Sequence, residues 1–268
     1  MARRNSPWAA SGLSNRPTPI RAIIFDLGHT VWDFAPRDDA YKLNILRLHE
    51  RLLAWDGGDV PAPKLLGRTL SKAIARWMSV WDSDVLEQAT SDVLVSEALA
   101  DAGLSPPPDV ISDIPTTLFG REIDMPYVEP DTLATFDSFH TDGIAMGCVT
   151  NTILLEEGIN DALMRLGLLR YFRSVVASSS MGFKKPHASL FQRALCELDI
   201  QPEEALFVGD RLVDDVSGAQ AVGMRAVLTH QFRQEPLDGA NVEPNAVISR
   251  LAELPDAIAA IERGASYP

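Results

Sequence analysis

The amino-acid sequence predicts an α/β protein: a doubly wound parallel sheet with an all-helical segment inserted after the first strand. In the second half of the chain, short apolar runs alternate with helical patterns, and this alternation is typical of a parallel sheet covered by helices on both faces. Between residues 35 and 120 the apolar residues recur only at helical spacing. We therefore predict a core from residues 21–34 and 125–268, a helical insert over 35–124 and a disordered tail over 1–20.

The tail and the first strand differ sharply in composition. Residues 1–20 contain three arginines and three prolines but no acidic residue, which favours a disordered terminus. The first strand is predicted at 22–26, where Ala22-Ile23-Ile24-Phe25 is a short run of apolar residues. Such a run is expected of a strand that is buried on both faces.

The insert is expected to contain at least three helices, with apolar residues three or four positions apart. Gly57-Gly58 and the two prolines around Ala62 separate the first two helices. The third is predicted to begin at Asp82 or Ser83, either of which can cap a helix. Their apolar positions are Tyr41, Ile45, Leu48 and Leu52 in the first helix, Leu70, Ile74, Trp77, Met78 and Trp81 in the second, and Leu86, Ala89 and Val93 in the third.

The remaining strands of the core are separated by helical patterns, one of which opens at Pro130. Parallel neighbours joined in this way take right-handed crossovers. The predicted strands lie at 144–149, 174–178, 205–209 and 225–229, the helices between them include 188–198 and 213–222, and a last strand–helix pair lies within 246–262.

The composition limits the class of protein. Hydrophobic residues make up 46% and charged residues 23% of the 268 residues, as in soluble globular proteins, and no apolar stretch approaches the length of a membrane span. The net charge of −13 argues against nucleic acid and anionic membranes as partners. Cys148 and Cys196 are far apart and lie in apolar patterns, so we expect two core thiols, no disulfide framework and a cytoplasmic protein. Both a monomer and a homodimer agree with these features.

Polar residues follow four of the predicted strands. Asp26 ends the first strand, Thr150-Asn151 follows the second and Lys184-Lys185 the third, and Asp210 ends the fourth with Asp214 and Asp215 just beyond. The carboxyl ends of parallel strands meet at one edge of the sheet, where ligands bind. Neighbouring carboxylates repel each other unless a cation lies between them, and carboxylates with waters and phosphate oxygens suit Mg²⁺. A carboxylate can also attack a phosphoryl group, so these residue types point to phosphoryl transfer with Mg²⁺ as cofactor.

These four elements, in this order, resemble the signature of the haloacid dehalogenase superfamily, and in particular its phosphatase-like members with a helical cap. The resemblance covers roughly residues 22–30 and 140–262. It implies that the helical insert is a cap over the site. It also implies a magnesium-dependent hydrolase that removes phosphate from a small phosphorylated metabolite through an aspartyl-phosphate.

The resemblance gives each residue at the strand ends an expected role. Asp26 matches the nucleophile and a metal ligand. Thr150 matches the hydroxyl that binds the phosphoryl group, with Asn151 beside it. Lys185 matches the lysine that steadies the nucleophile and the phosphoryl group, with Lys184 as the alternative. The expected metal residues are Asp26, Gly28 through its backbone carbonyl, Asp210 and Asp215, with Asp214 as the alternative to Asp215.

Gly28 is a departure from the family pattern. Phosphatases of this superfamily usually have an aspartate at this position, which protonates the leaving oxygen and then activates water, and such a group is worth about 10²–10⁴-fold in rate. Three hypotheses about the reaction follow. The protein is still a phosphatase, either slower or with His29, Asp33 or a residue of the insert in place of the missing acid; the protein cleaves a carbon–phosphorus or carbon–halogen bond; or the site binds phosphate or metal without turnover. We favour the first and predict His29 as a catalytic residue.

Overall fold

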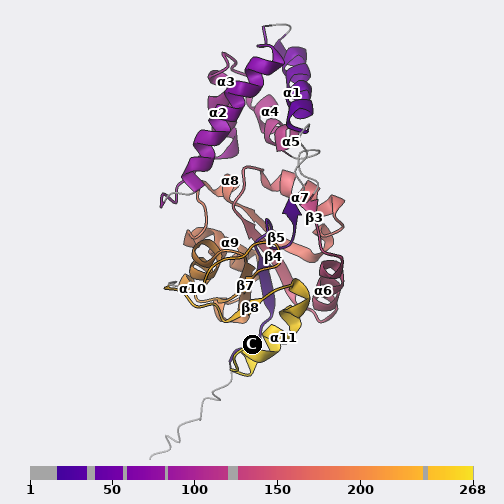
Figure 1. The fold of residues 1–268 in the computed structure, drawn as a ribbon, viewed down its shortest axis with the longest axis vertical. Helices are drawn as coiled ribbons and strands as arrows, with labels where there is room; N and C mark the ends of the chain where they lie inside the picture. Colours follow the sequence, from indigo (N-terminus) through magenta and orange to yellow (C-terminus); the bar gives the residue numbers. More distant parts are fainter. Residues whose placement is uncertain are drawn as a thin grey trace, which may run out of the picture.

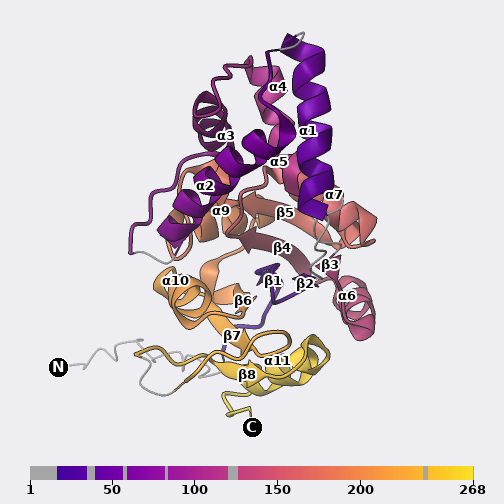
Figure 2. The same ribbon diagram turned by 45° about the horizontal axis from the view of Figure 1, so that its top comes forward.

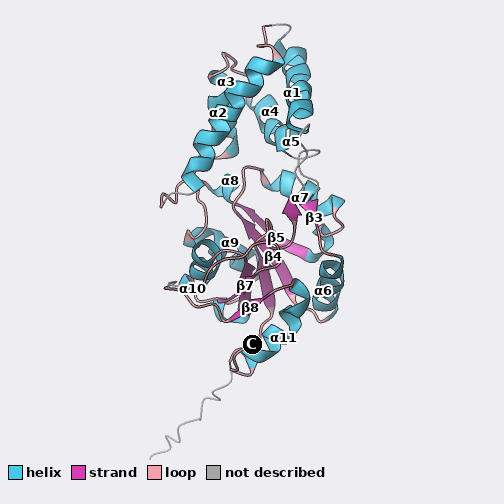
Figure 3. Ribbon diagram, viewed as in Figure 1, coloured by secondary structure: helices cyan, strands magenta, loops and turns pink. Residues whose placement is uncertain are grey.

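The six-stranded sheet of the core is parallel throughout, in a computed structural model that describes residues 17–34, 40–56, 59–81, 84–119, 126–237 and 241–267. Its order is β5-β4-β1-β6-β7-β8, which is the order of a doubly wound sheet. The expected fold class is confirmed (Figures 1 and 3). The strands are β1 (Ala22–Phe25), β4 (Ala145–Thr150), β5 (Phe172–Ala177), β6 (Ala205–Gly209), β7 (Arg225–Thr229) and β8 (Ala246–Ile248).

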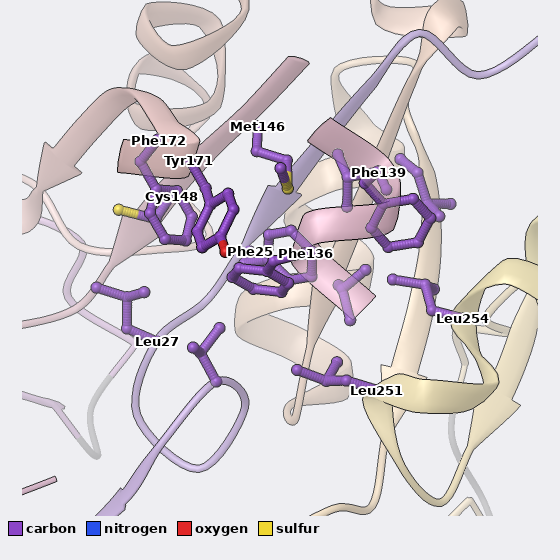
Figure 4. Packing of buried hydrophobic residues seen from close by; sticks show 14 of the residues in the cluster. Phe25, Leu27, Phe136, Phe139, Met146, Cys148, Tyr171, Phe172, Leu251 and Leu254 are labelled. Atoms are coloured by element: carbon purple, nitrogen blue, oxygen red, sulfur yellow. The ribbon is translucent and has the colours of Figure 1, made fainter. Parts of the chain in front are cut away.

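Side chains alternate between the two faces of the sheet, and each face has its own helices. Ile23 and Phe25 pack against α6, α7 and α11, whereas Ala22 and Ile24 pack against α9 and α10. Figure 4 shows Phe25 and Phe136 in contact in the first cluster, with ring centroids 4.9 Å apart. The helices of the core are α6 (Pro130–Thr141), α7 (Glu156–Arg165), α8 (Ser178–Met181), α9 (Ala188–Leu198), α10 (Gly218–Ala221) and α11 (Leu254–Glu262).

The strand order reverses direction at β1, and this places the site. The chain moves from β1 to β4 and β5 on one side, and then crosses to β6 and β7 on the other side. A crevice forms where successive connections leave in opposite directions. Asp26 follows β1 and Asp210 follows β6, so both carboxylates lie at this point.

The insert between β1 and β4 has a hydrophobic cluster of its own, which includes Leu48, Leu66 and Leu99. Figures 1 and 2 show its helices gathered at one end of the molecule, beyond the sheet. Two short strands, β2 (Asp33–Phe34) and β3 (Pro126–Tyr127), pair antiparallel where the chain enters and leaves the insert. The helices are α1 (Ala40–Asp56), α2 (Pro63–Trp81), α3 (Ser91–Ala100), α4 (Pro108–Ser112) and α5 (Ile114–Phe119).

The start of the third helix was predicted wrongly. The helix begins at Ser91 and not at Asp82 or Ser83, which lie outside the described residues. The preceding stretch is not helical, because its backbone pairs with the core: Gln88 N–H donates to Gly182 O at 2.9 Å and Lys184 N–H donates to Leu86 O at 2.9 Å. Tertiary hydrogen bonds of this kind override a helical pattern in the sequence.

Three further expectations differ from the structure. The predicted helix 213–222 is a π-helical turn, Leu212–Ser217, followed by α10. Cys148 is buried as expected, but Cys196 is exposed, so only one thiol is in the core. Residues 1–16 lie outside the described part of the chain, whereas Ile20, at the end of the predicted tail, is buried and donates its N–H to Glu262 at 2.7 Å. None of the described helices combines the length and the hydropathy of a membrane-spanning segment.

Phe136 tests the packing between α6 and the sheet, because its ring is fully buried against Phe25 and Phe172. We expect Phe136→Ala to lower the free energy of unfolding of the core by about 3–5 kcal/mol, through lost contacts and a cavity. Leu133→Ala on the same helix is the control, since Leu133 is 37% exposed, and it should cost at most about 0.5–1 kcal/mol. Equal shifts in urea denaturation of the two variants would contradict this packing.

Candidate active site

Asp26 is held at the carboxyl edge of the sheet by the backbone on both sides. Its N–H continues the ladder by donating to Val208 O at 2.8 Å, and the residue is only 6% exposed. The next residue, Leu27, has a carbonyl that accepts N–H bonds from Thr30, Val31 and Trp32. This tight turn begins directly after Asp26 and ends the strand there, so the Asp26 side chain lies at the end of β1.

Lys185 connects two buried carboxylates. Its Nζ donates to Asp26 Oδ1 at 2.7 Å and to Asp215 Oδ1 at 2.6 Å, and the three side chains are 3%, 8% and 1% exposed. The backbone N–H of Lys185 donates to Asn151 Oδ1 at 2.8 Å. The residue after β4 thereby fixes the loop that carries the lysine, and the lysine fixes the orientation of Asp26.

Asp210 completes a cluster of three acids. Asp26, Asp210 and Asp215 each offer one carboxylate oxygen within 4.8 Å of the others, and all three residues are buried. Gly209 makes the cluster possible, because a Cβ at this position would lie 2.3 Å from Asp215 Cγ. The second oxygen of Asp215 accepts the N–H of Arg211 at 3.0 Å. Both oxygens of Asp215 therefore already accept hydrogen bonds.

Burial and mutual repulsion disfavour charge on this cluster. Burial raises the pKa of Asp26 from 3.8 to about 7, although Lys185 opposes the shift and the charges of Asp215 and Asp210 add to it. Burial, followed by the charge of Asp215, raises the pKa of Asp210 to about 6. Burial also works against the charge of Lys185, but the carboxylates of Asp215 and Asp26 outweigh it and raise the pKa of the lysine.

The donor set fits a divalent cation. Three buried carboxyl groups lie beside one buried lysine, which contacts two of them. Once ionised they carry more negative charge than this lysine offsets, and their donors are hard oxygens of the kind that Mg²⁺ takes. Asp26 and Asp210 are the residues that would hold the ion, and the carbonyl of Gly28 stays a predicted ligand. Asp215, predicted as a further ligand, lies in the same cluster and also orients Lys185.

The alternatives for the lysine and for the downstream acid differ in their surroundings. Lys185 contacts Asp26, whereas the backbone N–H of Lys184 donates to Leu86 O in the insert. Asp215 contacts Lys185, whereas Asp214 is 20% exposed and faces Arg211 at 3.6 Å. The geometry thus favours Lys185 and Asp215. Thr150 is the last residue of β4 and is 5% exposed, at the edge where Asp26 also lies.

His29 and Gly28 occupy the turn after the nucleophile candidate. His29 has a φ of 59°, and its Nδ1 lies 2.9 Å from Asp33 Oδ1 with 42% of the side chain exposed. At Gly28, a Cβ would lie 3.3 Å from the ring of Phe34. The ring of Phe34 therefore stands beside the place where the family usually has an aspartate, and His29 is the titratable group next to it.

Arg233 was not found from the sequence. It lies in the loop after β7, and its Nη1 donates to Asp210 Oδ2 at 3.3 Å. It follows the end of β7 by four residues, but no motif distinguishes it from the other polar residues of this loop. It is a second cationic group beside the three acids.

The comparison with family models agrees with the resemblance that the sequence predicted. A family model described as a haloacid dehalogenase-like hydrolase matches residues 20–223. The chain belongs to this family, as the strand-end motifs predicted.

Among curated relatives, the glyceraldehyde 3-phosphate phosphatase of Methanopyrus kandleri (strain AV19) is 33% identical over 131 residues, which cover 48% of this chain and 55% of that protein. This chain therefore spans about half the length of the first curated relatives that it matches. The ribulose-1,5-bisphosphate 5-phosphatase of Halopiger xanaduensis (strain SH-6) is 28% identical, and the match covers 88% of this chain and 98% of that protein.

A solved 2-haloacid dehalogenase from Pseudomonas syringae pv. Tomato DC3000 shares the fold with a TM-score of 0.59 and 24% identity, and the match covers 90% of this chain and 98% of that one. A phosphatase structure from Thermococcus onnurineus has a TM-score of 0.56 and 23% identity, with 88% and 97% covered.

The raised pKa values predict how metal and pH act on stability. A carboxyl whose pKa is higher in the folded protein binds more protons when folded, so without metal Asp26 and Asp210 lower stability as the pH rises from about 4 to about 7. Mg²⁺ needs the ionised carboxylates and should remove this loss. We expect saturating Mg²⁺ to raise the melting temperature by about 5 °C or more near pH 8, and much less near pH 5.

Asp210→Asn removes a proposed metal ligand, so it should reduce the response to Mg²⁺ near pH 8. The exposed Asp142→Asn should not alter it. A response of the wild-type protein that is equal at both pH values would contradict the assignment of the ligands.

Proposed function

We propose that this protein is a magnesium-dependent phosphatase that removes phosphate from a small phosphorylated metabolite through an aspartyl-phosphate on Asp26. The observation that carries the proposal is the pair of short contacts from Lys185 Nζ to Asp26 and Asp215. They hold the Asp26 side chain at the carboxyl edge of the sheet in one orientation before any substrate binds. Such preorganisation lowers the barrier of a charge-forming step.

The residues suggest the order of events. Asp26 attacks the phosphorus atom, and the bond to the leaving oxygen breaks while that oxygen takes up a proton. Lys185 and the Thr150 hydroxyl bind the equatorial oxygens, where charge accumulates, and Asn151 holds the lysine loop in place. Water then attacks the acyl-phosphate, releasing phosphate and the Asp26 carboxylate. Mg²⁺, when bound by Asp26, Asp210 and the Gly28 carbonyl, would neutralise charge on the phosphoryl group.

The relatives support a small phosphorylated substrate. Two of those that match are named for glyceraldehyde 3-phosphate and ribulose-1,5-bisphosphate, and we propose a phosphorylated sugar or related metabolite here. The insert touches the core at the loops that follow β4 and β5, where Gln88 Nε2 donates to Thr152 O at 3.4 Å. We propose that it acts as a cap over the site, which would favour small substrates over proteins.

A panel of phosphate esters tests the reaction. With Mg²⁺, the wild-type protein should release phosphate from at least one ester, and chelation of the metal should stop the release. Asp26→Asn should abolish turnover, because the amide cannot attack phosphorus, whereas Asp142→Asn should keep it. Wild-type turnover no higher than that of Asp26→Asn would overturn the proposal and favour a binding protein. Halide release without metal, or a lysine adduct trapped by borohydride, would indicate the other hydrolases.

His29 is the proposed donor of the leaving-group proton, with Asp33 orienting its ring. A donor matters most when the leaving oxygen is strongly basic. We expect His29→Ala to lower kcat by about 10²–10³-fold with alkyl phosphates and far less with 4-nitrophenyl phosphate, whose leaving group needs no proton. Asp33→Asn should show the same pattern more weakly. An equal loss of kcat with both kinds of ester would show that His29 is not the acid.

A further inference from the structure

Arg233 lies at the boundary between the buried carboxylates and the solvent. Its side chain is 35% exposed, whereas Asp210, to which it donates, is 5% exposed. The contact of 3.3 Å is longer than both bonds of Lys185, at 2.7 and 2.6 Å. Arg233 is thus held to the cluster more weakly than Lys185 and is partly in water, where a rearrangement costs little.

The loop that carries Arg233 is fixed on both sides of it. Gln231 donates its amide to Thr30 O at 3.2 Å and accepts the N–H of Leu251 at 2.8 Å. Glu235 accepts the N–H of Leu212 at 3.3 Å, next to the end of β6. The loop therefore spans from the turn after Asp26 to the turn after Asp210, and Arg233 lies between these anchors.

The charges indicate why Arg233 contacts Asp210. Lys185 is engaged by Asp26 and Asp215, so without a metal ion Arg233 is the basic group that the described structure places on Asp210. A divalent cation among the carboxylates would neutralise them and weaken the attraction between Arg233 and Asp210. The guanidinium forms paired hydrogen bonds with phosphate oxygens in the same way as with carboxylates.

We propose that Arg233 is a substrate-binding residue, which exchanges Asp210 for an oxygen of the bound phosphate group once a divalent cation occupies the carboxylate cluster. The proposal rests on the proposed function, because it assumes that a phosphate group binds beside Asp26. Arg233 is then a second cation for the phosphate, beside Lys185, in a protein whose net charge is −13. In the metal-free protein Arg233 is paired with Asp210, so an incoming metal ion must compete with it for this carboxylate.

Calorimetric titrations on the full chain test both parts. Removing a competing cation should tighten Mg²⁺ binding, so Arg233→Gln should bind Mg²⁺ about five- to tenfold more strongly than the wild type. With Mg²⁺ saturating, the same variant should bind orthophosphate about tenfold more weakly. Arg233→Lys should recover only part of the phosphate affinity, because it keeps the charge but not the paired hydrogen bonds of the guanidinium. Arg250→Gln, which removes an exposed arginine paired with Glu129 and Asp131, should change neither constant.

Weaker Mg²⁺ binding in Arg233→Gln would overturn the proposal, because it would mean that Arg233 only holds Asp210 in position for the metal. Unchanged orthophosphate affinity would overturn it as well. If Arg233→Gln does not fold, Arg233→Met takes its place, because it also removes the charge while keeping an aliphatic side chain: tighter Mg²⁺ binding with weaker orthophosphate binding supports the proposal, and unchanged orthophosphate affinity contradicts it. These constants do not depend on turnover, so failure of the phosphatase proposal would appear separately in the ester panel.

Discussion

The contact of Lys185 with Asp26 and Asp215 is the interaction on which the rest of the site depends. Three carboxylates within 4.8 Å of one another, all buried, repel strongly. One lysine between two of them makes the arrangement tolerable, and removing one partner of a buried ion pair leaves an uncompensated charge at high cost. The neighbouring residues accommodate this contact. Asn151 holds the lysine loop, Gly209 leaves room for Asp215, and Asp210 is left facing the crevice with Arg233.

The same contact links the fold to the chemistry that we propose. The parallel order of β4, β1 and β6 brings three strand ends together, and residues far apart in the chain thereby share one small volume. The lysine keeps Asp26 in place, while metal and substrate are left to balance the remaining negative charge. Because the protein as a whole is acidic, this balance must come from local groups, and Lys185 and Arg233 are the basic side chains that the described structure brings to the cluster.

The sequence predicted the fold class, the strands of the core and the meeting of Asp26, Lys185 and Asp210, because apolar runs and strand-end residues are local signals and a parallel sheet brings strand ends together. It left Lys184 and Asp214 as alternatives, since neighbours in sequence differ only in which way the folded backbone turns them. It missed Arg233 and the pairing of β2 with β3, which depend on loops that meet only in the folded chain. It placed the start of α3 too early, because a helical pattern does not reveal that Leu86 O accepts the N–H of Lys184 and that Gln88 N–H donates to Gly182 O. The roles of the site residues, and the replacement of the missing aspartate at Gly28 by His29, stay predictions.

The most direct measurement of the central claim is the structure of the protein with beryllofluoride and Mg²⁺, since beryllofluoride mimics a phosphoryl group on a carboxylate. If Asp26 is the nucleophile, the beryllium should be bonded to an Asp26 carboxylate oxygen, with Lys185 beside its fluorines and the metal between Asp26 and Asp210. Beryllofluoride bound at another side chain, or at no side chain while the metal site is filled, would contradict the account.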